Sequence, residues 1–132
     1  MKVQVSRQNS HINGKYRLVI WKNTEYNIGS AYDARSGIFT CPYNGIYSFY
    51  VTSPVYKQHD TNIRIYVNGS SKVYHYLHNH GGGVYEFKHS SPYAVLKLSK
   101  GDIVHIYMTG LFHYANTQCT RTYFQGHLVD LL

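Results

Sequence analysis

The sequence predicts an all-β domain of antiparallel strands, and three observations support this prediction. The 132 residues include 15 Tyr and 5 Phe but only 3 Pro and 1 Trp, and aromatic residues fit the pleated, half-buried surface of a sheet. Short runs of alternating apolar and polar residues recur between Gly, Asn, Ser and Asp, which is typical of a sandwich or barrel. No segment carries an apolar stripe with helical period and caps. A chain of this length is expected to form a single domain, residues 1–132.

The predicted strands follow the chain in order, each marked by alternation or by a β-branched and aromatic run bounded by turn residues. They are Val3–Arg7, Arg17–Trp21, Ile38–Thr40, Gly45–Thr52, Asn62–Val67, Lys72–Leu77, Ser91–Leu98, Asp102–Tyr107 and Tyr123–Leu131. No internal repeat, linker or low-complexity tract separates them, so all belong to the same folding unit.

The strand Gly45–Thr52 follows a predicted turn at Pro42–Gly45, sequence PYNG. Side chains alternate between the two faces of a strand. One face therefore carries Tyr47, Phe49 and Val51, and the other carries Ile46, Ser48 and Tyr50. Both faces are mostly apolar or aromatic. Either one face packs inside the sandwich and the other against a second subunit, or both are buried within one chain.

Asn68 and Gly69 separate the runs IRIYV and SKVYHY. Both residue types tolerate the positive φ of a two-residue turn, so the sequence predicts a β-hairpin here. The tripeptide from Asn68 to Ser70 is also an N-glycosylation sequon, and a hairpin turn would expose it. A second tight turn is expected at Gly101 and Asp102, before the strand IVHIYM.

Composition and charge exclude several classes of protein. Hydrophobic residues make up 43% and charged residues 14%, which argues against intrinsic disorder, and no apolar run approaches the length of a membrane span. Thirteen Lys and Arg against six Asp and Glu give a net charge of +7, which favours anionic partners. The opening segment MKVQVSRQNSH lacks the apolar stretch of a signal peptide, which leaves two alternatives: a cytosolic protein, or a mature secreted form with an added Met.

Three blocks of residues resemble the C1q domain, the globular head of the complement recognition protein, which is related in fold to tumour necrosis factor. Residues 27–49, NIGSAYDARSGIFTCPYNGIYSF, look like the family pattern of an Asn, then Tyr-Asp, then Gly-x-Phe-Thr-x-Pro-x-x-Gly-x-Tyr-x-Phe. Residues 94–104, AVLKLSKGDIV, are similar to its apolar-Leu-x-x-Gly-Asp-x-Val motif. Residues 123–128, YFQGHL, are similar to its closing strand. The blocks fall in family order and extend over nearly the whole chain.

The resemblance implies a ten-stranded antiparallel jelly-roll sandwich that assembles as a homotrimer and is secreted. Many members of the family carry a collagen stalk, but this sequence contains no Gly-x-y repeat, so a bare head is expected. Bare heads of this kind are numerous in invertebrates, particularly molluscs, where they act as lectin-like proteins of innate immunity. The residues themselves suggest that Tyr47, Phe49 and Phe124 anchor a core or a subunit seam, and that the motif serves folding.

Catalysis finds little support in the sequence. The carboxylates Asp33, Asp60 and Asp102 are isolated, so no acid and base pair can be assigned. There is no nucleophile elbow, phosphate loop or dinucleotide fingerprint. Cys41 lies inside the structural motif, where burial explains it better than nucleophilic chemistry. Cys41 and Cys119 form a disulfide or remain free thiols; the sequence leaves both possibilities open.

Nine His residues are the unusual feature of the composition. Three of them, His75, His78 and His80, precede a run of three glycines, and His78 and His80 would share a face of a strand. Imidazole groups there could hold Zn²⁺ or Cu²⁺. The alternatives are a pH-responsive surface and loop residues without a role. Calcium is possible but unplaced, because Asp60 with Asn62 is the only suggestive pair.

Sugar sites combine an aromatic wall with a few placed polar groups, and loop residues of that kind gather in two segments. These are Tyr56, Lys57, His59, Asp60 and Asn62, and then His113, Tyr114, Asn116 and Arg121. Arg offers a planar fork for a carboxylate or phosphate. Tyr74, near the glycine run, is a further candidate beside His78 and His80.

The sequence therefore predicts a secreted, trimeric, non-enzymatic protein that binds carbohydrate, lipopolysaccharide or other anionic microbial surface ligands and needs no cofactor. Two alternatives are a tumour-necrosis-factor-like ligand of a cell-surface receptor and a histidine-rich extracellular metal-binding protein. Nucleic acid is not an expected partner, because no recognition module is visible.

Overall fold

The computed structural model of the chain describes residues 2–6, 17–18, 21, 23–56, 59–79, 87–109 and 123–132. Within these ranges all regular structure is β-strand, and all the strand pairs are antiparallel. These ranges contain no helix that is long and apolar enough to cross a membrane.

The described residues form twelve strand segments, of which β2 and β4 span two residues each and the other ten are longer. The segments are β1 (Lys2–Ser6), β2 (Arg17–Leu18), β3 (Asn23–Ile28), β4 (Tyr32–Asp33), β5 (Ile38–Thr40), β6 (Gly45–Tyr56), β7 (His59–Val67), β8 (Ser70–Asn79), β9 (Phe87–Ser90), β10 (Tyr93–Leu98), β11 (Ile103–Thr109) and β12 (Tyr123–Leu131).

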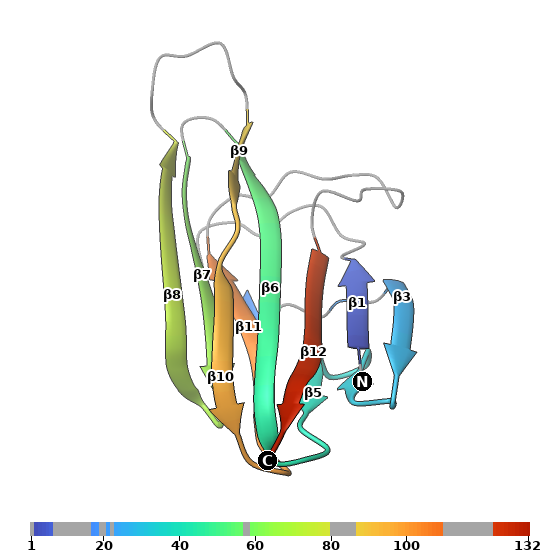
Figure 1. The fold of residues 1–132 in the computed structure, drawn as a ribbon. Helices are drawn as coiled ribbons and strands as arrows, with labels where there is room; N and C mark the ends of the chain where they lie inside the picture. The colour runs from blue at the N-terminus through green and yellow to red at the C-terminus, as the bar shows by residue number, and fades with distance from the viewer. Residues whose placement is uncertain are drawn as a thin grey trace.

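The strands form two sheets that pack face to face. Sheet A has the order β10-β6-β12-β1-β3, with β9 paired to the far end of β6; sheet B has the order β4-β5-β11-β7-β8, with β2 paired to β11. In Figure 1, sheet A lies toward the viewer and β11, β7 and β5 of sheet B lie behind it. The ten longer strands and this two-layer antiparallel arrangement confirm the predicted all-β sandwich.

The core lies between the sheets and is built from the inward half of each alternating strand. Tyr47 and Phe49 of β6 and Phe124 of β12 are fully buried. The Phe49 ring meets the Phe39 ring edge-on at 5.2 Å and stacks on the Phe124 ring at 6.1 Å. From sheet B come the aliphatic members Ile63, Ile65, Val104, Ile106 and Met108. The three predicted aromatic anchors therefore belong to the core of one chain and not to a subunit seam.

Most predicted strands are confirmed, and the differences have local causes. Of the predicted strand Arg17–Trp21, the described residues are Arg17–Leu18, which pair with β11, and Trp21, which lies outside any strand and is fully buried. Strands β3, β4 and β9 were not predicted. The strand predicted to end at Thr52 continues through Pro54 to Tyr56, because β9 pairs with that extension.

Residues around Tyr32, in the motif of residues 27–49, join neighbouring segments of the chain through hydrogen bonds. The Tyr32 hydroxyl accepts a hydrogen bond from the Trp21 backbone N–H at 2.9 Å and donates one to the Trp21 carbonyl at 3.1 Å. Burial, opposed by this hydrogen bonding, raises the pKa of Tyr32 to about 12. The Asn27 side chain donates to the Tyr32 carbonyl at 2.7 Å, and Asp33 accepts from the Arg35 N–H and the Ser36 hydroxyl. These groups serve folding, as the sequence indicated.

The hairpin between β7 and β8 has the predicted turn, with φ of 49° at Asn68 and 82° at Gly69. Positive φ at both positions defines a type I′ turn. The Asn68 side chain donates to Asp102 Oδ1 at 2.9 Å and accepts from the Ile103 N–H at 3.0 Å. The sequon is exposed, and its amide nitrogen is already engaged with Asp102; glycosylation there stays a prediction.

Replacing this amide by a carboxylate tests the hydrogen bonds that join the Asn68 turn to the Asp102 turn. The Asn68 hydrogen bond, together with the Ser99 N–H, holds the pKa of Asp102 below its usual range. Asn68→Asp removes that donor and places two carboxylates side by side, so we expect a loss of about 1 kcal/mol in the free energy of unfolding at pH 7. Urea unfolding measures it.

The exchanged pair Asn68→Asp with Asp102→Asn provides the control. It restores one amide donor and one carboxylate acceptor, so most of the lost free energy should return. Folding lowers the pKa of Asp102. The Asn68–Asp102 hydrogen bond of the wild type therefore stabilises the fold fully at pH values above the ordinary aspartate pKa, and this stabilisation is lost as the pH falls through the lowered pKa of the folded state. A double variant no more stable than Asn68→Asp would contradict this account.

Candidate functional site

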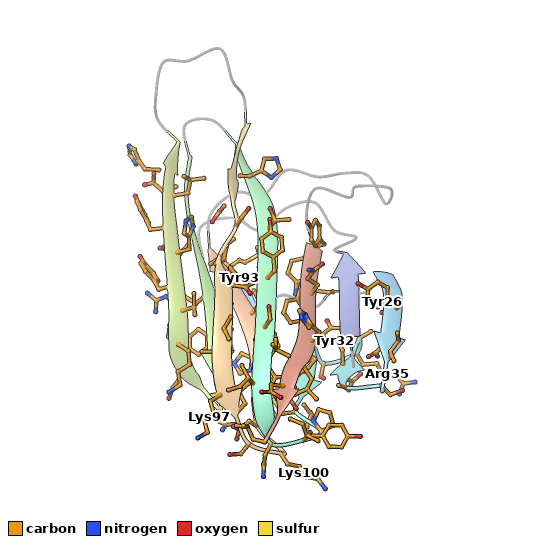
Figure 2. The ribbon with its side chains drawn as sticks, in the orientation of Figure 1. Tyr26, Tyr32, Arg35, Tyr93, Lys97 and Lys100 are labelled. Atoms are coloured by element: carbon orange, nitrogen blue, oxygen red, sulfur yellow. The ribbon has the colours of Figure 1, made fainter. Side chains whose placement is uncertain are left out.

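The outer face of sheet A is apolar and aromatic although it is turned away from the core. Strand register places Tyr93, Tyr50 and Gln125 in one row and Val95, Ser48 and His127 in the next. Tyr93 is 60% exposed and Val95 53% exposed, and the Tyr50 and Tyr123 rings meet at 5.7 Å. Figure 2 labels Tyr93 on β10 and Tyr26 on β3 at opposite margins of this sheet.

This face carries little charge for a chain of net charge +7. Its third row contains Lys97 and Asp130 on either side of Ile46, and Ile28 is exposed on the edge strand β3. Exposed aromatic and aliphatic side chains favour burial against another protein surface, although three charged residues lie in the same rows: Lys97, Asp130 and, by backbone register, Lys2 of β1. Of the two alternatives for residues 45–52, the structure places Tyr47, Phe49 and Val51 in the core and leaves Ile46 and Tyr50 partly exposed on the outer face. Contact of that outer face with a second subunit stays a prediction.

The outer face of sheet B has a different character, and we call its aromatic and polar residues the outer strip. The outer strip consists of Asp60, Asn62, Arg64 and Tyr66 on β7, Tyr74, Tyr76 and His78 on β8, and His105 and Tyr107 on β11. Pairing aligns them in rows, since Arg64 lies opposite Tyr74 on one side and Tyr107 on the other.

At one end of the outer strip, a histidine and a tyrosine both contact the same carboxylate. His78 Nδ1 lies 2.6 Å from Asp60 Oδ1, and the rings of Tyr76 and His78 stack at 6.5 Å. A hydrogen bond from the Tyr76 hydroxyl to Asp60 raises the pKa of Tyr76. The Asp60 carboxylate thus organises both neighbours.

In the middle of the outer strip, contacts with aromatic rings order the side chains. The Arg64 guanidinium lies 4.6 Å from the centre of the Tyr74 ring, a cation–π contact. Tyr66 stacks on His105 at 5.5 Å and meets Tyr107 at 4.7 Å. Burial lowers the pKa of His105, so this ring is neutral at pH 7 and packs as an aromatic group.

The structure rearranges the residues that the sequence assigned to binding. Asp60 was expected in a loop and Asn62 where that loop meets the predicted strand Asn62–Val67, but both lie within β7, because pairing with β8 continues as far as His59 opposite Asn79. The structure also brings Asp60 to His78, which the sequence placed in a separate group. Backbone atoms of Tyr56 and His59 lie at the adjoining ends of β6 and β7. The remaining glycan candidates, Lys57, His113, Tyr114, Asn116 and Arg121, lie outside the described residues.

Two of the three histidines proposed as metal ligands, His75 and His78, have separate partners. His75 Nδ1 hydrogen-bonds to the Ser90 hydroxyl of β9 at 2.5 Å, while His78 contacts Asp60 on the opposite face of β8. His80 lies outside the described residues, and those that are described contain no group of three or more metal-ligating side chains. The hydrogen bonds that Asp60 makes to His78 and Tyr76 also occupy the group considered for calcium. Both metal assignments stay predictions.

Cys41 is a buried free thiol, and Cys119 lies outside the described residues. Burial, with the nearby charge of Asp102, raises the pKa of Cys41 to about 12. At pH 8 only about one thiol in ten thousand is ionised, and the thiolate is the reactive form. We therefore expect iodoacetamide at pH 8 to leave Cys41 unmodified in the native protein and to modify it in guanidinium, as measured by peptide mass spectrometry. Rapid labelling of native Cys41 would contradict its burial.

Sequence reasoning missed five members of the outer strip: Arg64, Tyr66, Tyr76, His105 and Tyr107. The available signal was alternation within the hairpin, because Arg64 and Tyr66 lie between buried Ile63, Ile65 and Val67. Sugar-binding aromatic residues were expected in loops, whereas these residues belong to strands.

A sandwich of two antiparallel sheets, with exposed aromatic side chains on both outer faces, places the chain in the jelly-roll class of folds. The C1q domain family model matches residues 3–129. The chain belongs to the C1q domain family, whose members are generally non-enzymatic ligand-binding proteins.

Two curated relatives and one solved structure support this assignment. The chain is 34% identical over 114 residues to complement C1q tumor necrosis factor-related protein 3 of human, and likewise to that of mouse. Each alignment covers 79% of this chain and 42% of the relative, so the chain spans less than half the length of the curated relatives it matches. The globular domain of zebrafish complement 1qA protein matches with a TM-score of 0.74 at 20% identity, over 99% of this chain and 98% of the other. That match concerns the fold.

Proposed function

We propose that the chain is an extracellular recognition head that assembles as a homotrimer and binds carbohydrate or other anionic ligands on microbial surfaces. The observation that carries the assembly is the apolar outer face of sheet A, with Tyr93 and Val95 more than half exposed in the single chain. Members of the C1q family typically form trimers. A second and third copy of this chain are the occupants proposed for that face.

Trimerisation bears directly on binding strength. A single sugar site binds weakly, and three sites held together gain avidity without a new contact. Three chains of net charge +7 also create a strong positive field toward anionic cell surfaces, an attraction that salt weakens.

A binding screen tests the proposed recognition. The purified protein is applied to a panel of glycans and lipopolysaccharides in calcium, in chelator and at two salt concentrations, and its mass is measured by sedimentation. We expect a trimer that binds a subset of sugars, most strongly the acidic ones, with affinity that falls as salt rises. A trimer that binds no sugar or lipopolysaccharide in any condition would exclude the proposed recognition.

The name of the curated relatives includes tumor necrosis factor, which favours a receptor ligand as the second candidate. In that case the trimer binds a cell-surface protein, and the binding is independent of sugars and insensitive to salt. The same screen, extended to cells treated with glycosidases, separates the two functions.

A further inference from the structure

The outer strip is more elaborate than the folding of sheet B requires. Strands β7 and β11 bury their inward side chains in the core, and the partly buried Val73 of β8 packs against it, so the inward face accounts for the folding of the sheet. On the other face, Tyr74 and Tyr76 are 52% and 47% exposed, yet they are ordered by contacts with Arg64 and Asp60. Aromatic rings that are exposed and also held in place are typical of a binding surface.

We propose that the outer strip is the carbohydrate-binding surface of this head, and that it takes pyranose sugars bearing a carboxylate or a sulfate. The proposal rests on the function proposed above and names its site and its ligand class. Each part of the strip has a role in that recognition.

Tyr74 and Tyr76 provide the ring faces. They are two residues apart on β8, so their side chains point to the same side and stand about 7 Å apart along the strand. Successive sugar rings can lay their C–H faces on such a pair, while the hydroxyls of the sugars remain at the edges for polar groups. The Asp60 hydrogen bond orients the Tyr76 ring for that contact.

Arg64 provides the charge and the geometry for the acidic group. It lies in the central row between Tyr74 and Tyr107, with its guanidinium over the Tyr74 ring. A planar guanidinium binds a carboxylate or sulfate through two parallel hydrogen bonds. The only carboxylate of the outer strip, Asp60, lies at its far end and contacts His78, so the centre of the strip favours an anion.

Asn62 adds an acceptor for a hydroxyl group. Its side-chain oxygen is buried and receives no hydrogen bond within the described part of the chain, although buried acceptors are normally satisfied. Asn62 lies opposite Tyr76 in the next row along from Arg64 and Tyr74. A water or sugar hydroxyl that enters beside Tyr76 would supply the missing donor.

The composition of the outer strip distinguishes it from the face of sheet A. The strip consists of aromatic and polar side chains, whereas the face of sheet A includes the aliphatic residues Val95, Ile46 and Ile28. The two faces lie on opposite sides of the sandwich. A trimer closed through sheet A therefore leaves three outer strips available for one polysaccharide surface.

The test compares two strip variants, Arg64→Gln and Tyr74→Ala, with the control Lys72→Gln. Lys72 is an exposed cation of β8 outside the strip, and Lys72→Gln removes one positive charge, as Arg64→Gln does. Binding to alginate, heparin and neutral dextran is measured by biolayer interferometry at physiological salt, with melting temperature and sedimentation checked for each variant. We expect Arg64→Gln and Tyr74→Ala each to lower affinity for alginate or heparin at least tenfold, and Lys72→Gln less than twofold. Alginate carries carboxylates only, whereas heparin carries both carboxylates and sulfates, so binding to heparin but not to alginate would show that the sulfate is required.

The outcomes distinguish the site from the function. If the wild type binds no sugar, both proposals fail. If the wild type binds acidic sugars and both strip variants bind them as tightly as the wild type does, the strip is not the site, but the proposed function still stands. If Lys72→Gln loses as much as Arg64→Gln, net charge alone explains binding and the strip proposal is wrong. Equal affinity for dextran and alginate would refute the acidic class. Since Tyr74 is exposed, Tyr74→Ala remains informative if Arg64→Gln fails to fold.

Discussion

Phe49→Ala should lower the free energy of unfolding by about 3–5 kcal/mol, the usual cost of removing a buried phenylalanine. The Phe49 ring is fully buried and contacts rings from both sheets, with Phe39 at 5.2 Å, Phe124 at 6.1 Å and Tyr47 at 6.2 Å. An alanine leaves a cavity at the one point where these three rings meet. Urea unfolding at fixed protein concentration measures the change, since assembly would make stability concentration-dependent.

Gly126 provides an internal control for this packing. A Cβ at Gly126 would lie 2.8 Å from two atoms of the Phe49 ring, so Gly126→Ala should destabilise the wild-type protein. In a Phe49→Leu background the ring is gone, and the same substitution should cost clearly less. This non-additivity is expected only if the two residues touch. Equal costs in both backgrounds would contradict the packing described.

The fold was largely predictable, because its determinants are local and repeated. Alternation predicted Ile38–Thr40 and Tyr123–Leu131 with the bounds that the structure gives, and two residues tolerant of positive φ predicted the turn at Asn68 and Gly69. Strand β9 was missed because it depends on a distant partner. It pairs with the part of β6 that contains Pro54, and a proline normally ends the prediction of a strand.

The outer strip was less predictable, because one inserted residue decides which side chains belong to it. Continuous pairing from the Asn68 turn would set Tyr74 opposite Ile63 and turn it toward the core. The register instead shifts between Ile65 and Tyr66, which leaves Lys72 as the extra residue of β8. This bulge turns Tyr74 to the outer face opposite Arg64. The residues of the turn predict the β7–β8 register only as far as the first bulge. The position of the bulge depends on which side chains the rest of the fold buries, so the turn residues alone do not predict it.

Val95→Glu should reduce the proposed trimer to single chains. Val95 is 53% exposed in the single chain and lies beside Ser48, in the row next to Tyr93 and Tyr50, on the outer face of sheet A. A trimer seam through this face would bury three unpaired carboxylates, and burying an unpaired charge costs several kcal/mol. Sedimentation equilibrium should give the mass of one chain at concentrations where the wild type has the mass of three.

Tyr74→Glu is the matched control, because Tyr74 is 52% exposed on the other sheet, which the proposed seam does not use. It should sediment as the wild type does. Loss of the trimer should also reduce multivalent binding to a polysaccharide surface by about 10²- to 10⁴-fold while leaving binding to a short soluble sugar unchanged, because only avidity is removed. If Val95→Glu stays trimeric and Tyr74→Glu dissociates, the seam lies on sheet B, and both the assembly and the placement of the sugar surface proposed above are wrong.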